Sequence, residues 1–259
     1  MLTETLSNHP AALVEETSTA LDEQQRHVAW HEHHVIELRK QRRAARSWWQ
    51  ILQRLKDRRE VETLRANGPQ VDPGLRSELA RRQAGMAAED RAAYELSVLS
   101  NDWRLFRGYA NRRGEVDLLL VGPQGIWAVE VKGRAVVVHV DGHRWTFEKF
   151  DRYGNQVGQG VLQDKRGRSW GQQVHDVGRQ LEKFLSSRGL RVLVNPVVAV
   201  VNDNAAMGSF RDSTVMLSIG TGYLLGAIRD TPVVLDSGAR DRVSALIRRD
   251  HNFHANRRL

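Results

Sequence analysis

The sequence predicts a mixed α/β domain that follows a long helical extension. Arg, Gln, Glu and His dominate residues 21–64, which contain neither Pro nor Gly, so this stretch is typical of a long helix. After residue 100, short apolar runs are separated by Gly, Pro and Asp signals, which indicates strands and tight turns. The resulting order is helix, several strands, helix, strand, strand, helix. That order favours a mixed sheet with helices on both faces.

The extension is expected to cover residues 1–74. Its apolar residues form a short, imperfect heptad stripe, which His31 and Arg42 interrupt. The stripe consists of Val28, Val35, Leu38, Ala45, Trp49 and Leu52. It favours an amphipathic helix that packs on its own domain or on a partner over a true coiled coil. We therefore expect homo-oligomerisation or a protein partner at this helix, and a second domain over residues 75–259.

The second domain is expected to begin with a helix over residues 75–99. After this helix, the spacing of the apolar residues changes from that of a helix to that of strands. We expect strands at 103–109, 116–121 and 126–131, the last two joined by the turn Gly122-Pro123-Gln124-Gly125. The dipeptide Asp141-Gly142 predicts a hairpin between 136–140 and 144–150.

The rest of the domain is expected to alternate helices and strands. We expect a loop at 151–168, a helix at 170–188 ended by Gly189, and a strand at 191–201 buried on both faces. Further expected elements are a strand at 214–219, a short helix at 223–228 and a terminal helix at 236–251.

Composition limits the classes of function. The 39 Lys and Arg exceed the 31 Asp and Glu, which gives a net charge of +8 and favours polyanionic partners. Cysteine is absent, which excludes disulfides, zinc-thiolate sites, iron–sulfur clusters and cysteine nucleophiles. No apolar run approaches the ~18 to 20 residues of a membrane span, and the N-terminus lacks the features of a secretory signal. We expect a cytoplasmic protein without membrane contact.

Charged residues stand out on two of the expected strands. Glu130 and Lys132 are two residues apart on an apolar strand, so they share a face, which is costly if that face is simply core. Asp117 lies on the preceding strand, and the tight turn between the strands places it beside Glu130. We expect two neighbouring carboxylates with an ammonium group next to them.

This arrangement suits hydrolysis of a phosphodiester. Two adjacent carboxylates repel unless a cation or a proton lies between them, and oxygen ligands on a rigid sheet suit Mg²⁺, with Mn²⁺ as the substitute. A metal activates water and neutralises charge on the phosphate. We expect one of two roles for Lys132. It positions the water, or deprotonates it if the pKa of Lys132 is lowered; alternatively, it stabilises the negative charge of the transition state. The alternative to a hydrolytic site is that Glu130 and Lys132 form an exposed ion pair on an edge strand, while Asp117 caps a turn.

Asp117 followed by Glu130-Val131-Lys132 resembles the PD-(D/E)xK signature of restriction-endonuclease-like enzymes. More narrowly, residues 84–184 resemble the nuclease-related domain, NERD. The likeness includes an acidic residue in the preceding helix, Glu89, and a glutamine that opens the next helix, Gln173. It also includes Glu115-Val116-Asp117, Gly125-Ile126-Trp127 and Trp145. Val116 replaces the usual proline, and Ser169-Trp170 replaces an Asn-Pro pair.

The resemblance implies a restriction-endonuclease-like α/β/α fold and Mg²⁺-dependent cleavage of DNA. It assigns Asp117, Glu130 and the Val131 carbonyl to the metal. Lys132 then positions the attacking water, Glu89 supports the site, and Gln173 contacts the substrate or the groups around it. DNA is the expected partner, with RNA left open.

Basic residues in the loop before the expected helix at 170–188 are the candidates for phosphate contacts. They are Lys165, Arg166 and Arg168. Two weaker patterns are a histidine face at His27, His31 and His34, and Gly220-Thr221-Gly222, which lacks the spacing of a dinucleotide loop. The alternatives to a nuclease are a nucleic-acid-binding or scaffold module that keeps the fold without cutting, and an adaptor that acts through the N-terminal helix.

Overall fold

The computed structural model describes residues 1–44 and 61–255, and these residues form two compact units. The smaller unit is Pro10–Gln83, and the larger one combines Met1–His9 with Ala84–Leu259. The division falls after His9 and after Gln83, whereas the expected boundary lies after residue 74. A helical extension over 1–74 and a second domain over 75–259 remain a prediction.

The smaller unit is a helical hairpin. It contains most of α1 (His9–Ala44), a helical turn that begins at Val61 and the first part of α3 (Pro73–Leu96). The Arg82 guanidinium donates to the Leu13 carbonyl at 2.8 Å, and the Asp72 N–H donates to Gln24 at 2.9 Å. A Cβ on Gly68 would lie 3.1 Å from the His31 ring.

These contacts overturn the expectation of one helix over 21–64. In a single helix, residues 31 and 64 would lie roughly 50 Å apart at about 1.5 Å per residue, whereas both lie within 4 Å of a Cβ placed on Gly68. The chain instead returns along α1. Of the heptad stripe, Val35 is buried, whereas Ala45, Trp49 and Leu52 lie outside the described residues.

The larger unit is built on a six-stranded mixed sheet in the order β1-β2-β3-β4-β8-β10. Its strands are β1 (Leu2–Thr5), β2 (Arg104–Asn111), β3 (Gly114–Gly122), β4 (Gly125–Lys132), β8 (Val194–Val200) and β10 (Met216–Ile219). β2, β3 and β4 are antiparallel, whereas β8 runs parallel to β4 and β10. The antiparallel β3–β4 pair and the buried strand β8 confirm the expectations from the sequence.

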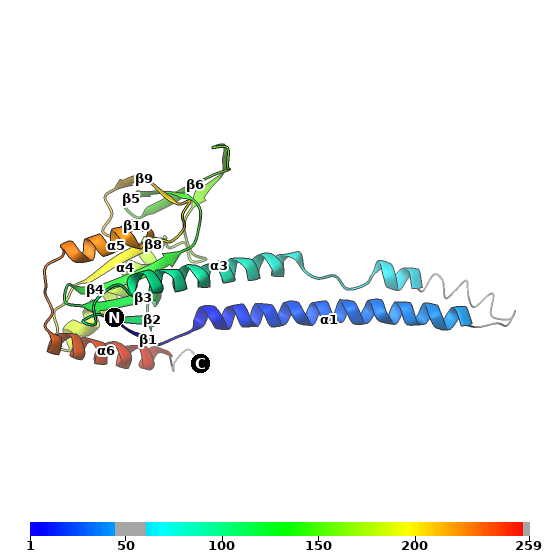
Figure 1. Ribbon diagram of the computed structural model, residues 1–259, viewed down its shortest axis with the longest axis horizontal. Coiled ribbons are helices and arrows are strands. Elements are labelled where there is room, and N and C mark those ends of the chain that lie inside the picture. The colour runs from blue at the N-terminus through cyan, green and yellow to red at the C-terminus, as the bar shows by residue number, and fades with distance from the viewer. Residues whose placement is uncertain (45–60, 256–259) are drawn as a thin grey trace. The chain divides into compact units, whose positions relative to one another are not determined.

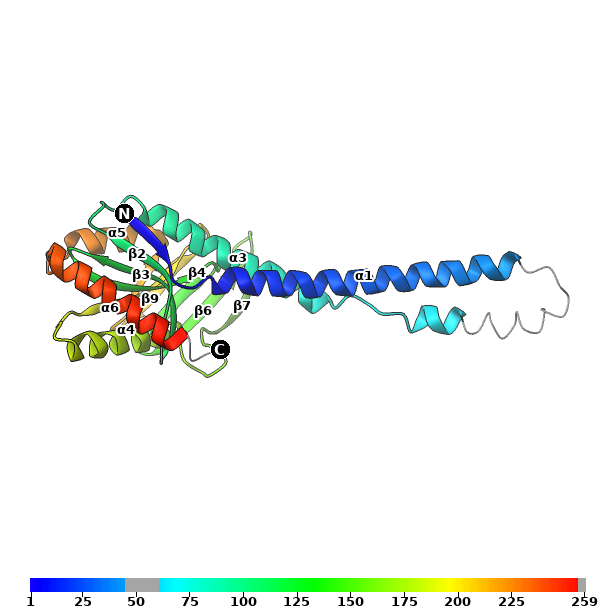
Figure 2. The same cartoon turned by 90° about the horizontal axis from the view of Figure 1, so that it is seen from below.

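Helices cover both faces of this sheet, as the sequence predicts (Figures 1 and 2). Residues 84–96 of α3 and α5 (Gly220–Asp230) pack on one face around Leu118, Leu120 and Trp127. On the other face, α4 (Trp170–Ser187) and α6 (Ser237–Ala255) lie near each other. None of the helices among residues 1–44 and 61–255 is long and apolar enough to cross a membrane.

A second sheet of four strands, in the order β7-β6-β5-β9, is a departure from the single sheet expected. It consists of β5 (Val137–Asp141), β6 (Arg144–Phe150), β7 (Gln156–Val161) and β9 (Ala206–Arg211). Its inner face packs on α4, where Trp145 meets Gly171 so closely that a Cβ there would lie 2.7 Å from the ring.

The hairpin predicted around Asp141-Gly142 is confirmed, but the loop expected at 151–168 is partly wrong because it contains β7. β1 and β9 were not expected either. All three strands are largely exposed and lack apolar alternation. β1 and β9 pair with strands that are remote in the sequence, whereas β7 pairs with the nearby β6.

Candidate active site

The two expected carboxylates meet where β3 and β4 separate. The regular pairing of these strands ends at Leu118 and Val129, and one further step places Asp117 opposite Glu130. Directly opposed residues have Cβ atoms about 5 Å apart. Beyond the last pair, the Val131 N–H donates to Asp117 Oδ2 at 2.6 Å, so the Asp117 side chain takes the place of the β3 backbone.

Glu130 and Lys132 form a largely buried ion pair. Glu130 is 7% exposed, and its Oε1 lies 2.7 Å from Lys132 Nζ. The Lys132 ammonium also lies over the Trp170 ring, 5.6 Å from the ring centre. The adjacent Val129 and Val131 pack on the opposite face, with α3. The expected alternation of this strand is therefore present, and Glu130 lies on a covered strand rather than on an exposed edge.

Glu89 joins the pair from α3. A Cβ on Gly133, the residue after Lys132, would lie 2.9 Å from the Ala88 Cβ, so α3 passes directly beside the end of β4. Burial raises the pKa of Glu89 to about 7, the Arg107 charge opposes this shift, and the Glu130 charge adds to it. The structure thus brings the acidic residue expected in the helix into electrostatic contact with the site.

The remaining pKa shifts follow from the crowding of these charges. Burial, followed by the Glu130 charge, raises the pKa of Asp117 well above its usual range. For Lys132, burial lowers the pKa, but Glu130 and Asp117 together outweigh this cost, and the net pKa is raised. Lys132 is therefore an ammonium at neutral pH, which disfavours its expected role as a base and leaves positioning or charge stabilisation.

The donors at this site fit a hard divalent cation. Within a strand, the N–H and C=O of one residue point to the same edge, so the Val131 carbonyl faces the same gap as the N–H that Asp117 accepts. Carboxylate and carbonyl oxygens suit Mg²⁺ or Mn²⁺. Burial and, after it, the Glu130 charge raise the pKa of Asp117, and a bound cation would offset both effects. No group of three or more His, Asp or Glu side chains in the described part of the chain has an arrangement that holds a metal. The candidate ligands for a metal are therefore the two carboxylates and the Val131 carbonyl.

Gln173, the glutamine expected to open the helix α4, does not take part in the cap of this helix. Ser169 caps the helix, and Gln172 rather than Gln173 completes a reciprocal capping box with it. Gln173 donates to the Arg168 carbonyl at 3.3 Å. Its contact with substrate remains a prediction.

The basic loop is a tight turn organised by Asp164. The Asp164 carboxylate accepts the N–H groups of Arg166 and Arg168, and it also pairs with the Arg168 guanidinium at 2.9 Å. Arg168 is therefore largely neutralised within the turn. Lys165 and Arg166 are exposed and remain candidates for phosphate contacts.

The histidine face of α1 and the Gly220-Thr221-Gly222 segment make contacts within the fold. His27 and His34 stack on either side of Trp30 along α1, with ring centres 6.4 Å and 5.3 Å from that of the indole. Gly220-Thr221-Gly222 begins α5, where the Thr221 hydroxyl donates to Glu95.

Two residues of the site were missed by reasoning from the sequence. Gly133 permits the close approach of α3, and Trp170 supports Lys132. The position of Gly133 directly after the Glu-x-Lys pattern could have indicated a close approach of another element. For Trp170, the replacement of the family's Asn-Pro pair by Ser169-Trp170 drew attention to the position, but it did not indicate the contact with Lys132.

Part of the chain is similar to a known protein family. The family model described as "nuclease-related domain" matches residues 84–201. The match begins at Ala84, the residue at which the larger compact unit resumes, and it includes Glu89, Asp117, Glu130 and Lys132. No curated protein and no solved structure matches the chain.

Proposed function

From the premise that residues 84–201 belong to the nuclease-related domain family, we propose that this protein is a metal-dependent nuclease that hydrolyses phosphodiester bonds of DNA. The observation that supports this most is the meeting of Asp117, Glu130 and Lys132 at the separating ends of β3 and β4. The family description supports a nuclease-like function, and the donor set supports the metal.

Asp117, Glu130 and the Val131 carbonyl are the proposed holders of Mg²⁺ or Mn²⁺. A bound divalent metal supplies Lewis acidity, which neutralises charge on the phosphate and makes water a better nucleophile at neutral pH. Asp117 is kept in place by the Val131 N–H, so its orientation depends on the backbone of β4.

Lys132 and Glu89 act on the water and on the charge that develops during attack. The Lys132 ammonium, fixed by Glu130 and by the Trp170 ring, donates to the attacking water or to a phosphate oxygen. Glu89, with a pKa of about 7, is suited to take the proton that the water releases as its oxygen bonds to phosphorus. The bond from phosphorus to the leaving oxygen breaks as the new bond forms.

Cleavage assays test this proposal. Labelled single-stranded DNA, duplex DNA and RNA are incubated with the purified chain in Mg²⁺, in Mn²⁺ and in EDTA. We expect cleavage of DNA only with metal, and a loss of at least about 100-fold in Asp117→Asn and Lys132→Ala.

Asp230→Asn is the matched control, because Asp230 is an exposed carboxylate at the end of α5. It should cut as the wild type does. Cleavage that persists in EDTA, or that survives in both site variants, would refute the proposal.

A second candidate is a nucleic-acid-binding module that keeps the fold without cutting. The Lys132–Glu130 ion pair favours it, because this contact occupies a carboxylate oxygen that a metal would use. Binding with a steep salt dependence but without cleavage under any metal condition would support this second candidate.

A further inference from the structure

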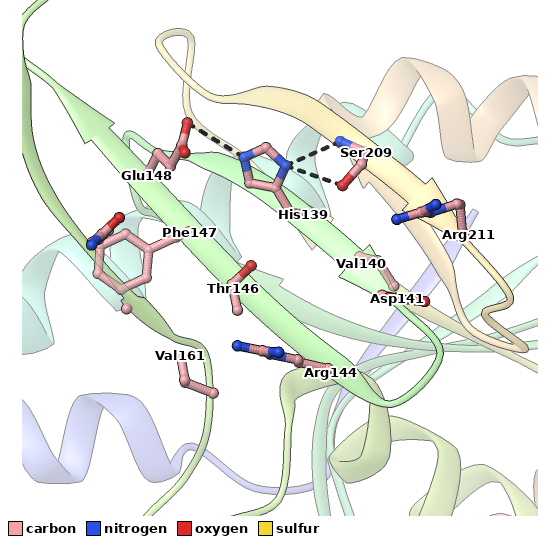
Figure 3. A pocket seen from close by; sticks show the side chains of 12 residues that line it. His139, Val140, Asp141, Arg144, Thr146, Phe147, Glu148, Val161, Ser209 and Arg211 are labelled. Atoms are coloured by element: carbon pink, nitrogen blue, oxygen red, sulfur yellow. Dashed lines mark hydrogen bonds and ion pairs between the residues drawn. The ribbon is translucent and has the colours of Figure 1, made fainter.

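A groove of about 630 Å³ lies along the second sheet (Figure 3). It is lined by β5, β6, β7 and β9, on the face opposite to the one that packs on α4. The register of β5 and β6 places His139 opposite Thr146 and Asp141 opposite Arg144 on this open face. The adjacent residues Val138 and Trp145 point into the core.

A β-bulge brings Arg211 onto the same face. Val137 pairs with Ala206, but after the register shift between Val138 and Val140 the pairing of Asp141 is with Arg211. Because side chains alternate along a strand, a regular strand would place Ala206 and Arg211 on opposite faces. The extra residue of the bulge reverses this, so Arg211 shares the open face with Arg144.

Contacts around His139 maintain the bulge. A Cβ on Gly208 would lie 2.4 Å from the His139 ring, so only glycine allows the ring to lie against β9 at this point. His139 Nδ1 accepts the Ser209 N–H at 3.1 Å and lies 3.2 Å from the Ser209 hydroxyl. Figure 3 shows the ring between Ser209 and Glu148. The direction of the Arg211 side chain is thus fixed by the bulge between β5 and β9.

The two guanidinium groups are available to an anion. Neither Arg144 nor Arg211 has an ion pair among the described residues, although Asp141 lies between them in the register. The other acidic residue of the groove, Glu148, faces His139 at 3.5 Å. An arginine on each side of one aspartate leaves an excess of positive charge at this end of the groove.

A short connection of residues 133–136 leads from the end of β4 to β5. The guanidinium of Arg134 in this connection lies 4.5 Å from the centre of the Phe147 ring. That ring is on the inner face of the sheet, with Val138 and Trp145. Arg134 follows Lys132 by two residues, so one further cation lies in the connection between the carboxylate site and the second sheet. β5 spans roughly 13 Å at about 3.3 Å per residue, which corresponds to about four nucleotides of a stacked strand.

We propose that this groove binds a single-stranded segment of the nucleic acid, with Arg144 and Arg211 on its phosphates. Two guanidinium groups on one open sheet face are placed to hold the phosphates of an extended strand, and phosphate contacts of this kind do not read the base sequence. The proposal rests on the proposed function for the identity of the polymer, but it concerns a site away from the carboxylates.

The test compares two variants of equal charge. Arg144→Gln/Arg211→Gln removes the groove cations, and Arg229→Gln/Arg242→Gln removes two exposed arginines from α5 and α6. Fluorescence anisotropy with a labelled single strand of about 16 nucleotides in EDTA measures the affinity without cleavage. We expect the groove variant to bind about 10-fold more weakly and its salt slope to fall by about 1.4, with a change below about twofold in the control.

A short substrate separates this proposal from the proposed function. A dinucleotide contains one phosphodiester and cannot reach the groove, so its cleavage with Mn²⁺ should be the same in the groove variant and the wild type. Weaker binding of the long strand without any cleavage by the wild type would support the groove and reject the nuclease. Cleavage of both substrates with unchanged binding would reject the groove.

A gain-of-affinity variant protects the test against loss of folding. Asp141→Asn removes the only negative charge between the two arginines in the register, so the long strand should bind about threefold more tightly. Unchanged or weaker binding by Asp141→Asn would contradict the proposal. Tighter binding of a duplex than of the single strand, with the same dependence on Arg144 and Arg211, would overturn the choice of a single-stranded ligand.

Discussion

The two sheets of the larger unit differ in what their strands bury. The six-stranded sheet is covered on both faces, and its central strands contain side chains that are almost fully buried, such as Leu119, Val129 and Val198. The four-stranded sheet is covered on one face only, and β9 is exposed along its whole length. A charged residue is therefore conspicuous in the first sheet, whereas in the second it looks like ordinary surface.

This difference decides what each sheet is able to do. In the first sheet, burial brings carboxylates and an ammonium group together at high electrostatic cost, and shifted pKa values of this kind support the catalytic site that we propose there. In the second, exposed arginines keep their hydration and suit the binding of an extended polyanion. The two sheets share one core beneath α4, where Trp145 packs on Gly171, so we treat them as parts of one domain.

The largest expected effect tests this shared core. Trp145 is 1% exposed, and Trp145→Ala should destabilise the protein by about 3 to 5 kcal/mol, measured by urea unfolding. Trp30→Ala is the control, because Trp30 is 61% exposed on α1 and should change stability by less than about 1 kcal/mol. A small effect at Trp145 would show that the second sheet folds without the first.

A smaller effect is expected where α3 approaches β4. Gly133→Val forces the new side chain against Ala88, and we expect a loss of about 1 to 3 kcal/mol together with reduced cleavage. Gly158→Val on β7 is the matched control, because its Cβ would lie an ordinary 3.8 Å from Lys149. Equal behaviour of the two variants would contradict the view that α3 positions Glu89 through this contact.

The pH dependence of stability gives an intermediate effect. The folded-state pKa of Glu89 is about 7, above the ordinary 4.5, so the folded state favours the protonated carboxyl. This contribution is fully present below pH 4.5 and is lost as the pH rises through 7. In metal-free buffer, the stability of the wild type relative to Glu89→Gln should fall by on the order of 1 to 2 kcal/mol from pH 4 to pH 8. Parallel stability curves would show that Glu89 is solvated as an ordinary surface residue.

The smallest expected effect concerns β1. Arg248 on α6 binds Glu4 at 2.7 Å, and this contact lowers the pKa of Glu4. A lowered pKa stabilises the folded state above the ordinary value of 4.5, and the gain is lost as the pH falls through the folded pKa. Both side chains are 39% exposed, so Glu4→Gln should cost less than about 1 kcal/mol at pH 7, and this cost should shrink as the pH falls below 4.5, by thermal unfolding. A larger cost would mean that β1 depends on this ion pair.

The same comparison explains what the sequence allowed us to predict. The carboxylate site was predictable because Glu130 and Lys132 interrupt an apolar strand and because Gly122 to Gly125 specify the turn that brings Asp117 back. The α4 helix was predictable from its apolar stripe and from Gly189, which has a φ of +81°.

The second sheet was only half predictable. Its hairpin follows from Asp141-Gly142. The outer partner of β5 is β9, which lies about 70 residues further along the chain, and β7, the outer partner of β6, lacks apolar alternation. The bulge that places Arg211 depends on a single register shift, and no local pattern marks such a shift. The return of the chain along α1 also escaped prediction, because Gly68 and Gly74 mark an end of the helix but not the direction of the chain after it.

The central claim is that Asp117 and Glu130 act together on a divalent metal. Single-turnover cleavage of a labelled DNA strand by the wild type, Asp117→Asn and Glu130→Gln, each in Mg²⁺, in Mn²⁺ and in EDTA, tests it most directly. The account predicts cleavage by the wild type only with metal, and a loss of at least about 100-fold in each variant. Metal-dependent cleavage that either variant retains at the wild-type rate would contradict it.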